Sequence, residues 1–221
     1  KLPITFPRTV GQIPTYYNHL RLGRPFVEGH PGNYTSQYFE EPNGPLYPFG
    51  YGLSYTDFSL SELQLSSRSL ARDGSLDVSL TLKNTGARDG ATVVQLYIRD
   101  IAASVVRPVK ELKRFRKVTL KAGEQTQVRF SINEEDLKFF NAQLQHLAEP
   151  GEFEVQIGLD SQAVQSQRFE LLFVGRTAPG LTLGDVDMEQ HQATVGQRQR
   201  AIIGGQHGGR SGTPLPKAQR P

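Results

Sequence analysis

The sequence predicts an all-β fold, a sandwich of two packed sheets with seven strands, over residues 57–172. Three observations indicate it. Apolar and polar residues alternate in short runs, which is the period of a strand with one buried face. Turn sequences rich in Gly, Pro, Asn and Asp separate the runs. The runs follow one another at the short spacing that is typical of β-sandwiches.

The first three expected strands are marked by their turns. Residues 58–65 begin the series with Phe and Leu at alternating places, and residues 76–82 alternate over their whole length. This second run ends at the turn sequence of residues 84–86, Asn-Thr-Gly. Residues 93–98 follow the next turn, Arg-Asp-Gly at 88–90, and form the third strand.

Four more expected strands complete the sandwich. They cover residues 112–120, 128–132, 153–157 and 168–172. Between the second and third of these, Asn133 can cap one helical turn within 133–140, and the three acids that follow it suit a helix N-terminus. The succession of seven short strands is that of an immunoglobulin/fibronectin-type-III-like sandwich.

Residues 1–56 are predicted to be irregular and rich in aromatic residues, with one short strand over residues 2–7. The density of Pro and Gly excludes a long helix. Disordered segments are poor in aromatics, so these rings must pack against another surface. That surface is either the sandwich that follows or a domain that precedes. In isolation the segment is expected to expose apolar surface. Seven tyrosines lie in it: Tyr16, Tyr17, Tyr34, Tyr38, Tyr47, Tyr51 and Tyr55.

The last part of the chain, residues 173–221, is predicted to be a disordered tail. It contains no aromatic residue after Phe173 and is rich in Gly. Six basic and three acidic residues there carry the whole net charge of +3, so residues 1–173 are neutral. The basic pI of about 9.2 therefore indicates no nucleic-acid surface on the folded part.

Composition excludes several kinds of site and partner. The chain has no cysteine, which excludes disulfides and thiolate metal centres. His191 and His207 do not have metal-ligand spacing, so neither a metal nor a cofactor is expected. No apolar run is long enough to span a bilayer. The first residue is Lys, which leads us to expect that the chain lies within a longer reading frame whose signal peptide is not seen.

No complete catalytic site is expected. Glycoside cleavage requires two carboxyl groups across a cleft, and Glu40, Glu41 and Asp57 are the candidates in the aromatic segment. Solvated loop acids are the simpler interpretation of all three. A serine nucleophile is also disfavoured, because residues 51–55, Tyr-Gly-Leu-Ser-Tyr, lack the second Gly of a nucleophile elbow.

Two further surfaces each have two interpretations. The basic stretch from Arg107 to Lys117 is either an anion-binding patch or a solvated strand face or interdomain contact, and the second is favoured because alternation divides the charges between two faces. The aromatic segment either packs between domains or presents rings to a sugar. In the sugar-binding interpretation, Tyr38 and Phe39 are the expected substrate-binding residues.

Several motifs give the chain a resemblance to a known family. Residues 44–56, Gly-Pro-Leu-Tyr-Pro-Phe-Gly-Tyr-Gly-Leu-Ser-Tyr-Thr, resemble the end of the second domain of family 3 glycoside hydrolases, as do residues 2–8 and 12–14. Residues 84–86, 89–97 and 107–113 resemble the fibronectin-type-III-like domain that follows it. The resemblance covers about residues 1–172 and is strongest to the periplasmic β-glucosidases of Gram-negative bacteria.

This resemblance implies a domain organisation and a function. Residues 1–56 would end the family's α/β sandwich domain and form a linker, and residues 57–172 would be the fibronectin-type-III-like domain. The family's Asp nucleophile and Glu acid/base belong to a barrel and an α/β domain upstream, so no catalytic residue is assigned here. The intact enzyme would hydrolyse terminal β-D-glucosyl residues with retention, and the partners implied are those two domains and β-glucosides. The location implied is periplasmic or secreted.

Two functional hypotheses follow. In the first, the chain is the accessory, structural part of a retaining β-glucosidase and is inactive alone, so whether the chain itself is an enzyme is left open. In the second, it is a free-standing carbohydrate-binding or adhesive β-sandwich module.

Overall fold

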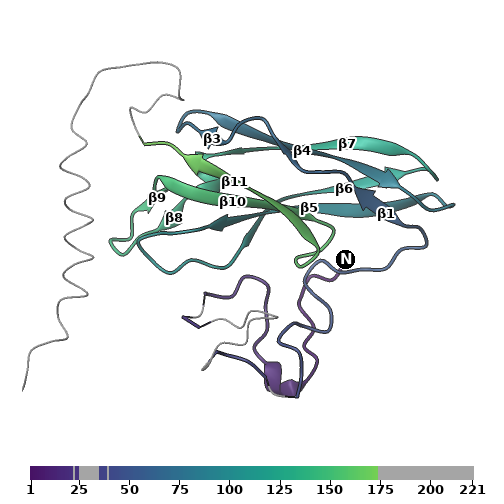
Figure 1. Cartoon of the computed structure of the whole chain (residues 1–221), viewed down its shortest axis with the longest axis horizontal. Coiled ribbons are helices and arrows are strands. Elements are labelled where there is room, and N and C mark those ends of the chain that lie inside the picture. Colours follow the sequence, from purple (N-terminus) through teal and green to yellow (C-terminus); the bar gives the residue numbers. More distant parts are fainter. Residues whose placement is uncertain (22, 25–34, 39, 174–221) are drawn as a thin grey trace, which may run out of the picture. The chain divides into compact units, whose positions relative to one another are not determined.

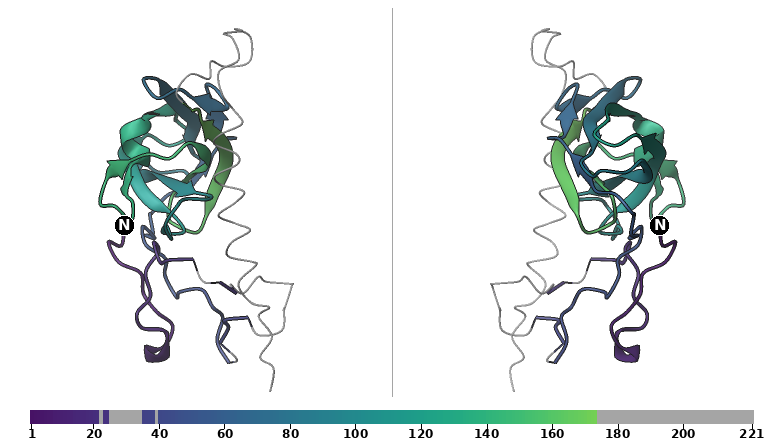
Figure 2. Two further views of the ribbon diagram at one scale, coloured as in Figure 1. Left: turned by 90° about the vertical axis from the view of Figure 1, so that its left-hand side faces the viewer. Right: turned by 90° about the vertical axis from the view of Figure 1, so that its right-hand side faces the viewer.

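The computed structural model describes residues 1–21, 23–24, 35–38 and 40–173. Within these ranges two β-sheets pack face to face, and a two-stranded hairpin and two short 3-10 turns complete the regular structure (Figures 1 and 2). The predicted all-β sandwich is confirmed. The tail expected to be disordered lies outside the described residues, apart from Phe173.

The first sheet is built around β4 (Ser75–Asn84) and is antiparallel throughout. β7 (Gln125–Asn133) pairs along one edge of β4, while β1 (Phe58–Leu60) and β2 (Gln64–Leu65) share the other edge. Leu60 lies opposite Leu82, but Gln64 lies opposite Ser79, so the register shifts by one residue between β1 and β2. The strand expected over residues 58–65 is therefore two short strands separated by an irregularity, as a bulge produces on an edge strand.

The second sheet has the strand order β3-β11-β10-β5-β6. Its members are β3 (Ser69–Leu70), β11 (Val164–Leu171), β10 (Gly151–Gly158), β5 (Gly90–Asp100) and β6 (Glu111–Leu120). All pairs are antiparallel except β3 with β11, which is parallel. β3 was not predicted, because two residues are too few to show a period.

The core lies between the two sheets and follows the alternation of the sequence. In β4 every second residue from Leu76 to Asn84 is buried, and in β7 the same holds from Val128 to Ile132. The second sheet contributes side chains such as Val94, Leu96 and Val155. Burying one such aliphatic side chain stabilises the fold by about 1.5–3 kcal/mol.

A helical turn and an unpredicted hairpin follow β7. The expected turn is the 3-10 helix η2 (Glu134–Leu137), where the Asn133 side chain accepts a hydrogen bond from the backbone N–H of Glu135 at 3.1 Å. The hairpin pairs β8 (Phe139–Phe140) with β9 (His146–Leu147). Asn141 organises its turn, because its Oδ1 accepts from the backbone N–H groups of Gln143 and Gln145.

Asn84 joins the sandwich to the segment before it. Its side chain is fully buried, and its Oδ1 accepts a hydrogen bond from Thr56 Oγ1 at 2.6 Å. Its Nδ2 donates to the carbonyls of Arg88 at 2.7 Å and Lys121 at 3.0 Å. A β-carbon at position 86 would come within 2.9 Å of the Asp57 backbone nitrogen, so Gly fits this close approach. The turn sequence at 84–86 thus has a structural role as a connector.

The N-terminal segment has little regular structure in its described part. It contains the 3-10 helix η1 (Val10–Gln12), and the strand expected at residues 2–7 is reduced to one isolated bridge between Phe6 and Tyr47. Backbone hydrogen bonds nevertheless hold residues 2–6 beside residues 46–51: Leu2 N–H donates to the Tyr51 carbonyl at 2.7 Å, and Gly50 N–H donates to the Leu2 carbonyl at 2.8 Å. Prolines at positions 3 and 7 lack the donors that a longer ladder requires.

Candidate functional site

The outer face of β5 carries two buried side chains. Val94, Leu96 and Ile98 of this strand point into the core. Gln95 and Tyr97, which alternate with them, therefore point to the outer face of the five-stranded sheet. Tyr97 is nonetheless fully buried and Gln95 almost so. A second layer must cover this face of the sheet.

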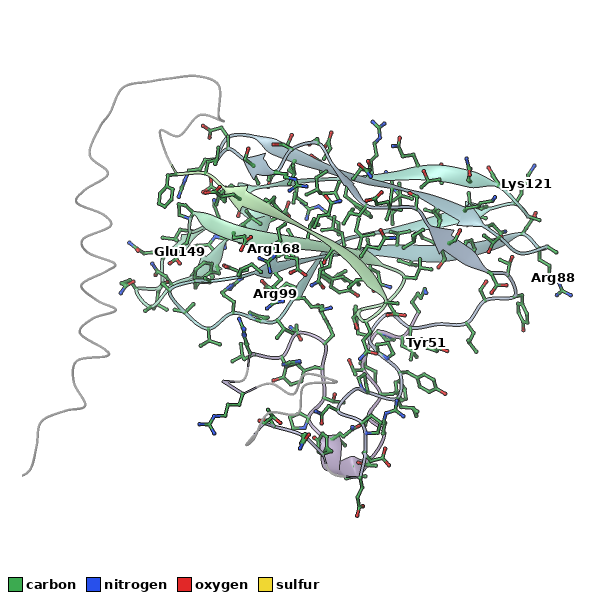
Figure 3. The ribbon with its side chains drawn as sticks, in the orientation of Figure 1. Tyr51, Arg88, Arg99, Lys121, Glu149 and Arg168 are labelled. Carbon is green, nitrogen blue, oxygen red and sulfur yellow. The ribbon has the colours of Figure 1, made fainter. Side chains whose placement is uncertain are left out.

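That layer is the N-terminal aromatic segment. The ring of Tyr17 stacks on Phe49 with centroids 4.4 Å apart and meets Tyr97 edge-on at 5.7 Å. Gln95 Nε2 donates to the Gly50 carbonyl at 3.3 Å and to the Leu159 carbonyl at 2.9 Å, and the Tyr97 hydroxyl donates to Gln95 Oε1 at 2.5 Å. These rings and hydrogen bonds attach the segment to the sandwich near Tyr51 (Figure 3).

Lys110 closes one side of this contact. Its ammonium donates to the Ser161 carbonyl at 2.7 Å and lies 5.8 Å from the centre of the Tyr97 ring. Ser161 N–H in turn donates to the Phe49 carbonyl at 2.9 Å. Burial lowers the pKa of Lys110, and burial likewise raises the pKa of Tyr97, so both groups are costly to ionise where they lie.

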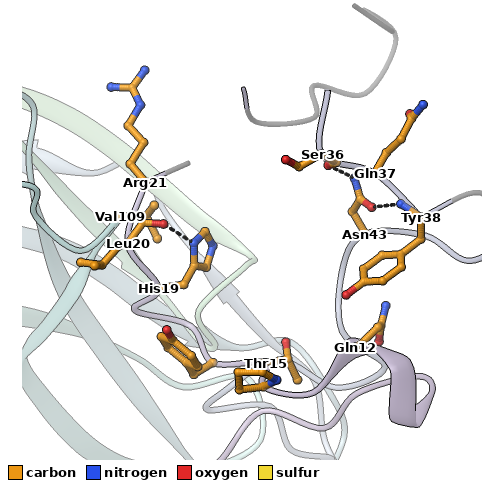
Figure 4. A pocket seen from close by; sticks show the side chains of 12 residues that line it. Gln12, Thr15, His19, Leu20, Arg21, Ser36, Gln37, Tyr38, Asn43 and Val109 are labelled. Carbon is orange, nitrogen blue, oxygen red and sulfur yellow. Dashed lines mark hydrogen bonds between the residues drawn. The ribbon is translucent and has the colours of Figure 1, made fainter. Parts of the chain in front are cut away.

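A pocket of about 700 Å³ lies beside this contact, lined by the aromatic segment and by Val109 of the sandwich. Figure 4 shows His19, Leu20 and Arg21 on one side of it and Tyr38 and Asn43 on the other. Asn43 Oδ1 accepts a hydrogen bond from the Tyr38 backbone N–H at 2.9 Å. Tyr38 is 46% exposed and lines the pocket, whereas Phe39 lies outside the described residues.

The comparisons with known proteins agree with this architecture. A family model described as fibronectin type III-like domain matches residues 92–161. A protein of Salmonella typhimurium named periplasmic β-glucosidase is 58% identical over 172 residues, which are 78% of this chain and 22% of that protein. A crystal structure of a β-glucosidase from Listeria innocua in complex with isofagomine has a TM-score of 0.71 and 46% identity, and the match covers 76% of this chain and 23% of that one.

A third match names the family. The crystal structure of the GH3 β-glucosidase of Bifidobacterium adolescentis is 33% identical with a TM-score of 0.53, and it covers 65% of this chain and 20% of that one. This chain belongs to the family 3 glycoside hydrolases. It spans only about a fifth of the length of the family members that it matches, 22% for the Salmonella protein.

The three candidate catalytic acids lie on the surface of the chain. Glu40, Glu41 and Asp57 are all exposed, and none of them lines the pocket beside Tyr38 or the smaller pocket beside Asp100. Within the described ranges, no three His, Asp or Glu side chains are grouped so that they could hold a metal ion. No helix among the described residues is long and apolar enough to cross a membrane.

Three of the six basic residues in the stretch from Arg107 to Lys117 are paired with acids. Arg107 Nη2 lies 2.6 Å from Glu111 Oε2, and Arg114 Nη1 lies 2.6 Å from Asp136 Oδ1. The Arg107 guanidinium also lies 4.4 Å from the centre of the Phe139 ring. These contacts favour the structural interpretation of the stretch over an anion-binding patch.

One carboxylate beside this stretch is poorly paired. Asp100 Oδ2 is buried, has no hydrogen-bond partner among the described residues, and lies 3.9 Å from Arg107 Nε. Burial raises the pKa of Asp100 above its ordinary value, and this effect exceeds the opposing attraction of Arg107. The group is therefore a source of pH-dependent stability.

Sequence reasoning missed Gln95 and Tyr97. The signal was present, because residues 93–98 are almost continuously apolar rather than alternating, which indicates a strand covered on both faces. The predicted need for a packing surface is met in part by the sandwich, which covers Tyr17 and Phe49, while several other rings of the segment remain exposed.

Proposed function

We propose that this chain is the C-terminal accessory part of a retaining β-glucosidase and has no hydrolytic activity alone. The observation that carries the proposal is the 58% identity to a β-glucosidase over a region that is 22% of that enzyme's length. Retaining hydrolysis requires two carboxyl groups about 5–5.5 Å apart. The candidate acids of this chain, Glu40, Glu41 and Asp57, are all exposed, so the reacting carboxylates are assigned to the other domains of the enzyme.

The role proposed for the sandwich is mechanical. The remaining domains, a barrel and an α/β domain, would bind the β-glucoside, and the sandwich would hold residues 1–56 in a fixed conformation beside them. The contacts from Gly50 to Gln95 and from Tyr17 to Tyr97 support this role, because they order a segment that cannot form sheet or helix by itself. A periplasmic location is proposed by analogy with the Salmonella relative.

The test uses the purified chain and an aryl β-D-glucoside. The chain alone is expected to release no aryl alcohol, whereas an enzyme in which residues 1–172 replace the matched region of the Salmonella β-glucosidase is expected to hydrolyse it. Hydrolysis by the isolated chain would refute the accessory role. An inactive but folded chimera would also count against it.

Tyr38 and Phe39 are proposed as sugar contacts in the assembled enzyme. Tyr38 supports this because its half-exposed ring lines a pocket of about 700 Å³ together with polar groups, the composition that sugar sites use. In the chimera, Tyr38→Ala is expected to raise KM more than it lowers kcat. Phe140→Ala, which removes an exposed ring from the β8–β9 hairpin, is the control and should change neither constant.

The same pocket supports the second candidate, a carbohydrate-binding module. In that case the isolated chain would be retarded in affinity electrophoresis through a β-glucan gel, and Tyr38→Ala would remove the retardation. Unretarded migration of the wild-type chain leaves the accessory role as the better supported function.

A further inference from the structure

One asparagine on the wall of the pocket stands directly before a glycine. Asn43 is the only one of the six asparagines of the sequence that glycine follows. The backbone nitrogen of the next residue can attack the side-chain amide carbon of an asparagine, and glycine hinders this approach least because it has no β-carbon. Asn43 is also exposed, so water reaches its side chain. These are the conditions for deamidation.

The amide group of Asn43 is held in a way that favours attack on its carbon. Figure 4 shows its two hydrogen bonds beside the pocket. Its Oδ1 accepts from the Tyr38 backbone N–H at 2.9 Å, and its Nδ2 donates to the Ser36 carbonyl at 3.4 Å. Attack on the amide carbon moves negative charge onto Oδ1, and a fixed N–H aimed at such an oxygen stabilises that charge. The bond from Nδ2 is long, so it holds the departing nitrogen only weakly.

The attacking nitrogen is unpaired while its surroundings are fixed. The Gly44 N–H takes part in none of the hydrogen bonds among the described residues. The Gly44 carbonyl, in contrast, accepts from Arg8 Nε at 3.2 Å and from Gln12 Nε2 at 3.4 Å. Gln12 Nε2 also donates to the Pro42 carbonyl at 3.0 Å. The carbonyls before and after Asn43 are therefore anchored, and no hydrogen bond has to break before the Gly44 nitrogen reacts.

We propose that Asn43 is a site of spontaneous deamidation, a modification that is independent of the proposed function. The Gly44 nitrogen forms a bond to Asn43 Cγ, and the bond from Cγ to Nδ2 breaks. Nδ2 leaves as ammonia together with the proton of the Gly44 N–H. Water then opens the resulting succinimide at either of its two carbonyls, which leaves aspartate or isoaspartate at position 43.

The modification would change the wall of the pocket in two ways. The new carboxylate has no N–H, so it loses the hydrogen bond to the Ser36 carbonyl and adds a negative charge. Isoaspartate also inserts a methylene group into the main chain between the Pro42 and Gly44 carbonyls. Gln12, which is 5% exposed, then cannot keep its bonds to both. The Arg8 N–H, which donates to Gln12 Oε1 at 2.6 Å, is expected to be released with it.

The test incubates the full chain at mildly alkaline pH and follows its peptides by mass spectrometry. The Asn43 amide is expected to be replaced by a mixture of aspartate and isoaspartate. Gly44→Ala should lose the amide about tenfold more slowly, since rates fall steeply when reacting atoms are held apart. Alanine fits there, because φ of Gly44 is not left-handed and a β-carbon meets only the Gln162 side chain, at 3.4 Å. Asn141 is the internal control: its Oδ1 also accepts backbone N–H groups, but alanine follows it, so it should keep its amide.

Three outcomes would overturn the proposal. The first is an Asn43 amide that persists in the folded chain but is lost when the chain is unfolded in urea, because the fold would then protect the site. The second is equal loss in Gly44→Ala, and the third is aspartate without isoaspartate, because either would exclude the attack by Gly44.

Hydrogen exchange tests the consequence for the pocket. The isoaspartate form, separated by ion exchange, should exchange its Arg8 amide faster than the unmodified chain. Asn43→Asp keeps the original main chain and should leave the Arg8 amide as protected as in wild type. Equal protection of Arg8 in the isoaspartate form would refute the predicted release of Gln12.

Discussion

Gly50 offers the sharpest test of how the aromatic segment is attached. Its φ is +79°, a conformation that costs an L-residue about 1 kcal/mol. A β-carbon there would come within 2.7 Å of Gln95 Cδ and still closer to its amide atoms. Gly50→Ala therefore strains the backbone and also displaces the Gln95 side chain.

The displacement has the larger effect. Gln95 is almost fully buried and exchanges hydrogen bonds with Gly50, Leu159 and Tyr97. Leaving such buried groups unpaired costs about 1–3 kcal/mol, so we take about 2 kcal/mol. Together with the backbone strain, Gly50→Ala should lower the free energy of unfolding by about 3 kcal/mol.

Gly123→Ala is the matched control. Gly123 has a similar φ of +75°, but a β-carbon there meets no atom within 4 Å. It should lose only about 1 kcal/mol. Urea unfolding followed by circular dichroism measures both losses, and hydrogen exchange at the Gly50 amide, which binds the Leu2 carbonyl at 2.8 Å, reports the local release. Equal losses in the two variants would refute the reasoning.

Three further predictions concern other positions. Asn84→Ala should lower the free energy of unfolding by about 3 kcal/mol in urea titrations, because it leaves buried partners such as Thr56 Oγ1 unpaired. The control, Asn141→Ala in the exposed hairpin, should lower the free energy of unfolding by less than about 1 kcal/mol. Since burial raises the folded-state pKa of Asp100, the folded chain holds this proton more tightly than the unfolded chain, and its contribution to stability declines as pH rises from 3.8 through the raised value. Asp100 faces Arg107, Glu149 and Glu111, and Asp100→Asn should remove this decline, so that the stability of wild type relative to the variant falls as pH rises above 3.8; a constant difference would contradict the assignment. Removing the exposed Lys138–Glu135 ion pair by Lys138→Ala should leave the urea unfolding midpoint unchanged, because solvent screens exposed pairs, and a clear drop in the midpoint would contradict this.

The strands were predictable where one face is buried and the other solvated. β4 and β7 alternate cleanly, and their expected ranges agree with the structure to within a few residues. The edge strand at residues 58–65 was predicted as one element, because a one-residue shift of register leaves no mark on composition. β8 and β9 were not predicted, because their pairing depends on the Asn141 turn rather than on periodicity.

The candidate site was less predictable than the fold. Sequence alone indicated that the tyrosines need a surface, but which rings meet the sandwich depends on pairings distant in sequence, such as Tyr17 with Tyr97. Tyr38 does line a pocket, while its contact with sugar stays a prediction. The domain boundary at residue 56 stays a prediction as well. The burial of Asp100 was not foreseeable, since it depends on contacts with Ala102 and Arg107 in the loop that follows β5.

The hydrogen bond between Thr56 and Asn84 bears on how this chain can be shortened. A fragment that begins at residue 57 would lack the Thr56 hydroxyl that binds Asn84. It would also lack the segment that covers Gln95 and Tyr97, so these side chains, which are buried in the intact chain, would be exposed to water. Such a fragment should aggregate, whereas one that retains the leading residues should remain dispersed. The smallest autonomous piece is therefore larger than its strands suggest.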